Sequence, residues 1–185
     1  MRVIAGIAKG RKLKSPPDKR VRPTADRVKE AIFSMLGSAI ATETFIDLFA
    51  GSGAIGIEAL SRGAERVIFV DNSKKSIALI KENLELTGFR GSADVIQLDI
   101  SKSLEPLTTG GYTGGIVFMD PPYDFEPLEQ FIEKVVDSTL LATDGILIVE
   151  HSKKRRYQDT KYPAEKEKIY GDTRLTIIRK AGDSI

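Results

Sequence analysis

Short apolar runs alternate with helix-spaced apolar positions between residues 44 and 150 of the chain. The runs Val67–Val70 and Ile146–Val149 are apolar at every position, which is typical of parallel strands that are covered on both faces. The segment Val28–Leu36 instead repeats its apolar residues at intervals of three or four, as an amphipathic helix on a core does. Repeated strand–helix units predict an α/β protein with a doubly wound, mostly parallel sheet.

Glycines, prolines and capping residues mark the ends of the predicted elements. Strands are expected at Thr44–Leu48, Arg66–Val70, Asp94–Leu98, Gly115–Met119 and Gly145–Glu150. Helices are expected after the N-cap Thr24 and near Ala54–Arg62, Ser73–Leu86 and Pro127–Ser138. The last two strands, Lys166–Tyr170 and Arg174–Arg179, flank Gly171-Asp172 as an antiparallel hairpin. The predicted sheet therefore has seven strands and a C-terminal antiparallel hairpin.

The first 22 residues predict a small basic β-hairpin extension in front of a main domain of residues 23–185. Two short strands, Arg2–Ala5 and Arg11–Lys14, are expected around a glycine-bearing turn. Residues 1–30 hold ten Lys or Arg against three acids, a charge of +7, so the remaining 155 residues carry −5. This asymmetry favours a polyanionic partner, although a solvated surface segment explains the charge equally well. We expect an appendage that does not affect the rest of the chain's ligand binding.

The residue types also exclude several classes of protein. The chain has no cysteine and one histidine, so it has no disulfide or thiolate zinc site, and we expect no metal. No apolar run is long enough to span a bilayer, and the start lacks the apolar centre of a signal peptide. We therefore expect a cytoplasmic protein without membrane contact, and a monomer.

A glycine loop follows the first predicted strand and opens a helix. Its glycines, Gly51, Gly53 and Gly56, form the pattern G-x-G-x-x-G, which lets backbone approach a nucleotide at a helix N-terminus. Asp71 stands 20 residues after Gly51, where a carboxylate binds ribose hydroxyls. This fingerprint alone also fits a dinucleotide.

Two further acids favour S-adenosylmethionine over a dinucleotide. Asp47 lies in the loop, where it would repel pyrophosphate but suits the cationic amino-acid part of S-adenosylmethionine, directly or through water. Asp99 follows the third strand and is placed to reach the adenine amine, so three acids meet at one sheet edge. The predicted cofactor site consists of Asp47, Phe49, Ala50, Gly51, Ser52, Gly53, Gly56, Asp71, Asn72, Asp99 and Ile100.

The fourth strand ends in the motif Asp120-Pro121-Pro122-Tyr123. The prolines fix the backbone and remove two donors, so the Pro121 carbonyl and Asp120 can present two acceptors to the two hydrogens of an amine. An amine on a flat base is a poor nucleophile, and gripping both hydrogens aligns its lone pair for in-line attack on a methyl group. Tyr123 supplies a face on which an extruded base can stack. We predict these four residues as the catalytic set.

The chain resembles the class I amino-methyltransferases, whose Rossmann-like sheet ends in such a hairpin. Its opening resembles one family specifically, the bacterial 16S ribosomal RNA guanine-N2 methyltransferases of the RsmD type. The residues that carry this likeness are Arg2–Gly6, Lys9–Leu13, Arg22–Thr24 and Arg27–Phe33. The resemblance implies a guanine in 16S ribosomal RNA as substrate, free or in a small-subunit particle, and S-adenosylhomocysteine as coproduct.

With such a substrate, the basic residues near the N-terminus become candidate RNA contacts. The predicted RNA-binding residues are Arg2, Lys9, Arg11, Lys12, Lys14, Arg20, Arg22, Thr24 and Arg27. The run Lys153–Arg156 is either a solvated face or a second phosphate contact. His151 is expected to be structural or peripheral, because water can take the proton that the methylated amine sheds.

Three alternative functions stay open at this stage. A DNA adenine-N6 methyltransferase shares the chemical motif but usually needs a larger base-reading domain. A protein glutamine methyltransferase usually starts its motif with Asn, whereas this one starts with Asp120. A non-catalytic RNA-binding assembly factor would not need an intact glycine loop and catalytic motif.

Overall fold

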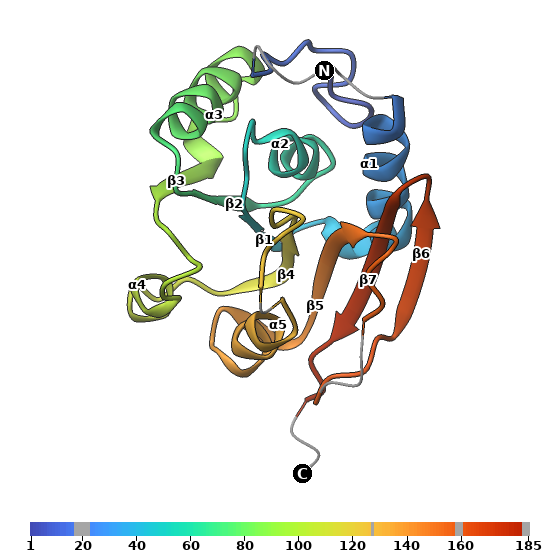
Figure 1. Ribbon diagram of the computed structural model, residues 1–185. Coiled ribbons are helices and arrows are strands. Elements are labelled where there is room, and N and C mark those ends of the chain that lie inside the picture. The colour runs from blue at the N-terminus through green and yellow to red at the C-terminus, as the bar shows by residue number, and fades with distance from the viewer. Residues whose placement is uncertain (17–22, 127, 158–160, 183–185) are drawn as a thin grey trace.

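Seven strands form one sheet in the order β3-β2-β1-β4-β5-β7-β6 (Figure 1). The computed structural model describes residues 1–16, 23–126, 128–157 and 161–182. The strands are β1 Thr44–Leu48, β2 Arg66–Asp71, β3 Ala93–Gln97, β4 Gly114–Met119, β5 Leu141–Ser152, β6 Lys166–Tyr170 and β7 Thr173–Arg179. The first five are parallel, and β7 runs antiparallel to both β5 and β6. The predicted doubly wound sheet with its C-terminal hairpin is therefore confirmed.

Helices cover both faces of this sheet (Figure 1). One face carries α1 Pro23–Leu36, α2 Ala54–Ser61 and α3 Lys74–Thr87, and the other carries α4 Glu105–Thr109 and α5 Leu128–Asp137. Two 3-10 turns, Gly37–Ile40 and Arg90–Ser92, connect helices to strands. The sequence predicts a loop where α4 lies, because a five-residue helix is too short to show a helical period.

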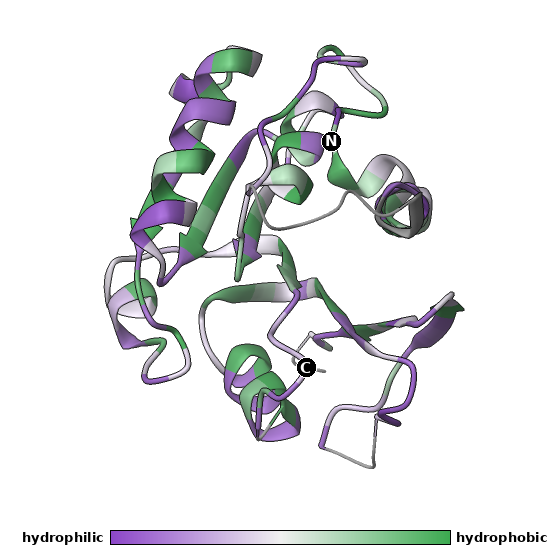
Figure 2. Cartoon of the chain, turned by 45° about the horizontal axis from the view of Figure 1, so that its top comes forward, coloured by the Kyte–Doolittle hydropathy of each residue, from purple (hydrophilic) through white to green (hydrophobic). Residues whose placement is uncertain are grey.

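The core consists of two layers, one on each face of the sheet. The layer under α1, α2 and α3 contains Phe45, Phe69 and Phe118, and the layer under α4 and α5 contains Met119 and Val149. Successive residues of one strand thus enter opposite layers, which requires the uninterrupted apolar runs of the sequence. Figure 2 shows these strands as mainly hydrophobic, whereas the helices mix hydrophobic and hydrophilic residues.

The N-terminal segment forms the predicted β-hairpin only in part. Arg2 and Lys12 form one antiparallel bridge pair, and the N–H groups of Val3 and Leu13 donate to the carbonyls of Arg11 and Met1 at 3.0 and 2.9 Å. Neither predicted strand is continuous, because the N–H groups of Ile4, Ala5 and Ala8 donate to side chains of α2 instead. Val3, Ala8 and Leu13 are buried in the core layer of α1–α3, so residues 1–16 share the core of the main domain.

The described residues show neither a membrane-spanning helix nor a cluster of metal ligands. None of their helices is long and apolar enough to cross a membrane. No cluster of three or more His, Cys, Asp or Glu within this part of the chain is arranged to hold a metal ion.

Candidate active site

The loop between β1 and α2 brings the three predicted glycines to the carboxyl edge of the sheet. Gly51 and Gly53 have φ angles of 58° and 77°, which residues with a side chain rarely adopt. A Cβ on Gly56 would lie 2.3 Å from the ring of Phe69 on β2. Two glycines therefore shape the loop, and the third lets α2 pack against the sheet with its N-terminus at the strand ends.

Two of the predicted cofactor acids lie at this edge with backbone or side-chain partners. Asp71 accepts hydrogen bonds from the N–H groups of Gly51 and Ser73, each at 2.8 Å. A carboxylate offers about four acceptor positions, so Asp71 can hold the loop and still bind ribose hydroxyls. Asp99 is turned toward its neighbours: a hydrogen bond from Ser101, and then one from Lys102, lower its pKa. The ligand roles of both acids stay predictions.

Other members of the predicted cofactor set contribute through backbone or packing. The N–H group of Ala50 donates to the Val70 carbonyl at 2.9 Å, and Ile100 is buried in the layer of α4 and α5. Asn72 is exposed, and its carbonyl accepts a hydrogen bond from Gln97. The side chain of Ile100 thus faces the core, which leaves only its backbone for a ligand.

Phe49 connects the glycine loop to the opposite side of the sheet edge. It has a φ of 64°, a strained conformation for an aromatic residue that is typical of functional loops. Its ring meets those of Phe125 and Phe131 edge-on, with centroids 5.3 and 6.1 Å away. The ring predicted to touch the cofactor therefore also belongs to an aromatic cluster with the segment that follows Tyr123.

Asp47 is the most deeply buried acid of the predicted site, with 1% of its surface exposed. Burial raises its pKa to about 8, the charges of Asp120 and Asp71 add to the increase, and a hydrogen bond from the Gly56 N–H group at 3.0 Å opposes it. The repulsion indicates that Asp47, Asp71 and Asp120 lie near one another. A cationic group bound nearby would favour the ionised form of Asp47.

We expect Asp47→Asn to stabilise the ligand-free protein increasingly between about pH 4 and pH 8. The pKa of an aspartate carboxyl is 3.8 without the fold, and that of Asp47 is about 8 in the folded protein, so only the unfolded chain loses this proton in that range. Wild-type stability therefore falls as pH rises through the range, at up to about 1.4 kcal/mol per unit. Urea denaturation of both proteins at three pH values measures the difference, and parallel pH profiles would contradict the assignment.

The predicted catalytic motif, Asp120–Tyr123, follows β4 directly and forms an exposed turn. Pro121 is buried, whereas Tyr123 is 71% exposed. The N–H group of Phe125 donates to the Pro122 carbonyl at 2.9 Å and closes the turn. The structure thus brings Asp120 to the same edge as Asp47 and leaves a tyrosine face open beside it.

Glu150 is an acid of this site that the sequence analysis did not identify. It follows Val149, which pairs with Met119 in the β4–β5 register, so Glu150 within β5 lies at the same level as Asp120, which follows β4. Burial and the charge of Asp120 raise the pKa of Glu150 to about 8, and a hydrogen bond from Thr173 at 3.5 Å opposes the rise. An acid that ends a wholly apolar strand is the signal that could have revealed it.

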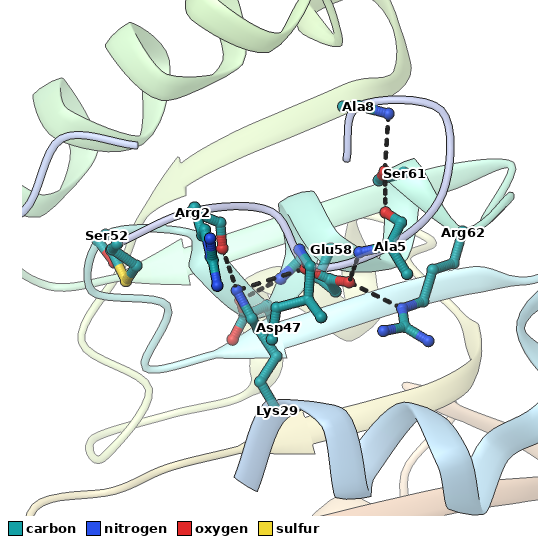
Figure 3. Close-up of polar contacts among 12 residues, drawn as sticks. Arg2, Ala5, Ala8, Lys29, Asp47, Ser52, Glu58, Ser61 and Arg62 are labelled. Carbon is teal, nitrogen blue, oxygen red and sulfur yellow. Dashed lines mark hydrogen bonds and ion pairs between the residues drawn. The ribbon is translucent and has the colours of Figure 1, made fainter. Parts of the chain in front are cut away.

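A fully buried carboxylate, Glu58 of α2, fastens the N-terminal segment to the helices (Figure 3). It accepts hydrogen bonds or ion pairs from the N–H groups of Ile4 and Ala5, from Arg62 Nε and from Lys29 Nζ, at 2.8, 2.9, 2.9 and 3.3 Å. Lys29 Nζ also donates to the Arg2 carbonyl at 2.6 Å. Burial lowers the pKa of Lys29, and Glu58 opposes the decrease. We call this group the Glu58 clamp.

Asn83 of α3 joins the N-terminal segment to the glycine loop. Its fully buried amide nitrogen donates to the carbonyls of Ser52 and Lys14 at 2.9 and 3.1 Å, and its oxygen accepts from the Lys14 N–H group at 2.8 Å. The Ser52 hydroxyl also lies 3.8 Å from the sulfur of Met1. The fold therefore brings the N-terminal segment into contact with the glycine loop, although the two are distant in the sequence.

The predicted RNA-binding residues have different surroundings in the structure. Lys14 pairs with Glu82 at 2.7 Å, and Arg11 donates to the Leu86 carbonyl at 2.8 Å. Arg2, Lys9 and Arg62 line an open hollow of about 650 Å³. None of the acids at the strand ends borders this hollow, so we expect the active site at the strand ends and not in the hollow. Lys12 and Arg27 are exposed. Arg20, Arg22 and the side chain of Thr24 lie outside the described residues.

The chain is similar to known proteins over nearly its whole length. The family described as "Conserved hypothetical protein 95" matches residues 1–179. The chain is 38% identical to Ribosomal RNA small subunit methyltransferase D of Haemophilus influenzae, over 83% of the chain and 79% of that protein. It is 37% identical to the Escherichia coli protein of the same name, over 81% of the chain and 74% of the relative. A solved methyltransferase-like structure from Escherichia coli superposes with a TM-score of 0.83 at 31% identity, over 99% of this chain and 99% of that one.

Proposed function

Because the chain belongs to the family of the ribosomal RNA small subunit methyltransferases D, we propose that it methylates the N2 amine of a guanine in 16S ribosomal RNA. The methyl donor in this proposal is S-adenosylmethionine, and S-adenosylhomocysteine is the coproduct. The observation that carries the proposal is the Asp120–Tyr123 turn, which leaves the sheet beside the glycine loop and the buried Asp47.

The residues at the sheet edge fit S-adenosylmethionine better than a dinucleotide. Asp71 would bind the ribose, Asp99 the adenine amine, and Asp47 the cationic amino-acid part. Pyrophosphate would meet the repulsion of Asp47, Asp71 and Asp120, whose charges already oppose one another. When bound, the sulfonium group supplies an electrophilic methyl that needs no metal.

The catalytic turn fits a planar amine that lies across the cleft from the donor. Asp120 and the Pro121 carbonyl accept the two amine hydrogens and so orient the nitrogen lone pair toward the methyl group. Tyr123 stacks on the base, which must leave its helix or loop to reach the turn. Their contribution is orientation and electrostatic stabilisation of the charge that develops on the amine.

The choice of small-subunit ribosomal RNA is supported by the names of the relatives, and the choice of guanine N2 follows the resemblance of the N-terminal residues. Transfer of labelled methyl to deproteinised ribosomal RNA, to DNA and to protein separates this proposal from an adenine-N6 or a glutamine methyltransferase. Mass mapping of the modified nucleoside, in cells with and without the protein, identifies the base. Absence of transfer to any acceptor, including ribosomal particles, would favour an assembly factor.

Asp71→Ala should weaken S-adenosylmethionine binding by at least tenfold. It removes two charge-assisted hydrogen bonds to the ribose, each worth roughly 1.5–3 kcal/mol, and it also frees the N–H group of Gly51. Titration calorimetry measures the loss. Asp94→Ala, which removes an acid paired with Arg66 on the next strand, is the control, and equal affinities in both variants would contradict the assignment.

The basic N-terminal segment should bind RNA phosphates through Arg2, Lys9 and Lys12, which are exposed. Replacing all three by glutamine should reduce the slope of log affinity against log salt by about 2, using about 0.7 per single-strand phosphate contact. Replacing Arg11 and Lys14, which contact α3, should change the slope less. Filter binding across salt concentrations tests this, and parallel slopes for wild type and triple variant would refute it.

A further inference from the structure

We propose that Arg155 is a positioning residue of the target site, which holds the turn Asp120–Tyr123 in place from the end of β5. This inference rests on the proposed function, because it assigns Arg155 to the turn that would bind the target amine. The basic run Lys153–Arg156 is thereby divided between internal contacts and solvent, instead of forming one phosphate-binding patch.

The contacts of Arg155 use the whole guanidinium group. It forms bidentate salt bridges with Glu126, at 2.7 and 2.9 Å, and with Glu129 on α5, at 2.6 and 3.2 Å. A fifth contact runs to the Phe125 carbonyl at 3.3 Å. Such planar, paired contacts to two carboxylates require arginine, because a lysine ammonium has no comparable fork.

These contacts reach the catalytic turn through Phe125. The N–H group of Phe125 closes the turn at the Pro122 carbonyl, and its carbonyl binds Arg155. Its ring packs against Phe49 of the glycine loop. Phe125 is thus fixed at three points, and Arg155 is the one that ties it to β5.

Arg155 also borders the motif directly. A small cavity of about 10 Å³ lies between the end of β5 and the turn, lined by Pro121, Pro122, Tyr123, Phe125, Leu128, His151, Ser152 and Arg155. His151 is buried, its Nε2 lies 2.8 Å from the Thr176 hydroxyl, and burial lowers its pKa. The structural role expected for His151 stays a prediction.

The neighbours of Arg155 in the basic run have different surroundings. Lys153 pairs with Asp172 at 2.7 Å, whereas Lys154 and Arg156 are exposed. The guanidinium of Arg155 is about one-fifth exposed and already faces two carboxylates. A phosphate would therefore be repelled from Arg155. Arg156 is the next residue in the chain and is exposed, which makes it the matched control.

Arg155→Lys should lower kcat for RNA methylation by about 10- to 100-fold, because a misplaced reacting group has effects of this order. The affinity for S-adenosylmethionine should stay within about twofold, and the salt slope of RNA binding should not change. Arg156→Lys should leave kcat unchanged. A fall in cofactor affinity equal to the fall in kcat, or an unchanged kcat in Arg155→Lys, would overturn the proposal.

Two further variants test the same point independently of turnover. If Arg155→Gln reduces the slope of log RNA affinity against log salt while kcat is retained, Arg155 contacts a phosphate and the proposal is overturned. The chain contains no tryptophan, so Tyr123→Trp places a single reporter on the turn. Its fluorescence anisotropy should fall when Arg155→Lys is added and stay constant with Arg156→Lys. This result reports the mobility of the turn independently of the acceptor, and an unchanged anisotropy would refute the positioning role.

Discussion

Asp120→Ala should lower kcat by about 10²- to 10³-fold, the loss expected when one preorganised polar contact to the transition state is removed. Asp120 would contact the target amine and not the methyl donor, so the affinity for S-adenosylmethionine should stay within about twofold. Single-turnover kinetics with labelled cofactor measure the rate, and calorimetry measures the affinity. Asp124→Ala, an exposed acid of the same turn, is the control and should retain the wild-type rate.

The same variant should leave an electrostatic signature on its neighbours. The charge of Asp120 raises the pKa of both Asp47 and Glu150, so its removal should lower the pKa of each carboxyl. Proton uptake measured near pH 8 should then shift to lower pH in Asp120→Ala. A loss of turnover with no such shift and with equally weakened cofactor binding would point to a collapsed site, and would contradict the role assigned to Asp120.

The sheet and the edge that carries the acids could be predicted because their signals are local. Strands such as Ile146–Val149 are apolar throughout, and Gly51, Gly53 and Gly56 occur at a spacing that a strand–turn–helix unit needs. The structure gives each glycine a separate physical reason: positive φ for two of them, and contact with Phe69 for the third. Local patterns of this kind predict where such a glycine loop lies.

The parts that could not be predicted depend on partners distant in the sequence. Glu58 lies in a helix and looks like any polar helix position, yet its partners Ile4 and Ala5 are more than 50 residues away. Arg155 belongs to a run that usually indicates a solvated face, and its carboxylate partners are 26 and 29 residues away. Hydrophobic periodicity predicts which residues face a core, but it does not predict which charged side chains form ion pairs with each other.

The second large effect that we expect is on stability, in Glu58→Ala. The variant leaves Lys29, which is 3% exposed, with the Arg2 carbonyl as its remaining hydrogen-bond acceptor in the Glu58 clamp. It also removes the acceptor of the Ile4 and Ala5 N–H groups. Breaking a buried ion pair from one side typically costs about 3–5 kcal/mol. This is a large part of the roughly 5–15 kcal/mol that stabilises a typical domain.

The loss should be visible as release of the N-terminal segment. Urea denaturation followed by circular dichroism measures the stability, and trypsin should cleave residues 1–16 of Glu58→Ala faster, since this segment is rich in Lys and Arg. Glu82→Ala is the matched control, because it removes an exposed partner of the same segment, a pair worth about 0–1 kcal/mol.

A double variant separates the loss of the charge pair from a general packing defect. Glu58→Leu with Lys29→Met removes both buried charges and keeps much of their volume, so it should recover part of the stability lost in Glu58→Ala. The two N–H groups stay without their acceptor in both variants, which limits the recovery. If Glu58→Ala lies within about 1 kcal/mol of wild type, the clamp does not hold the segment. In that case the segment's docking depends on the burial of Val3, Ala8 and Leu13.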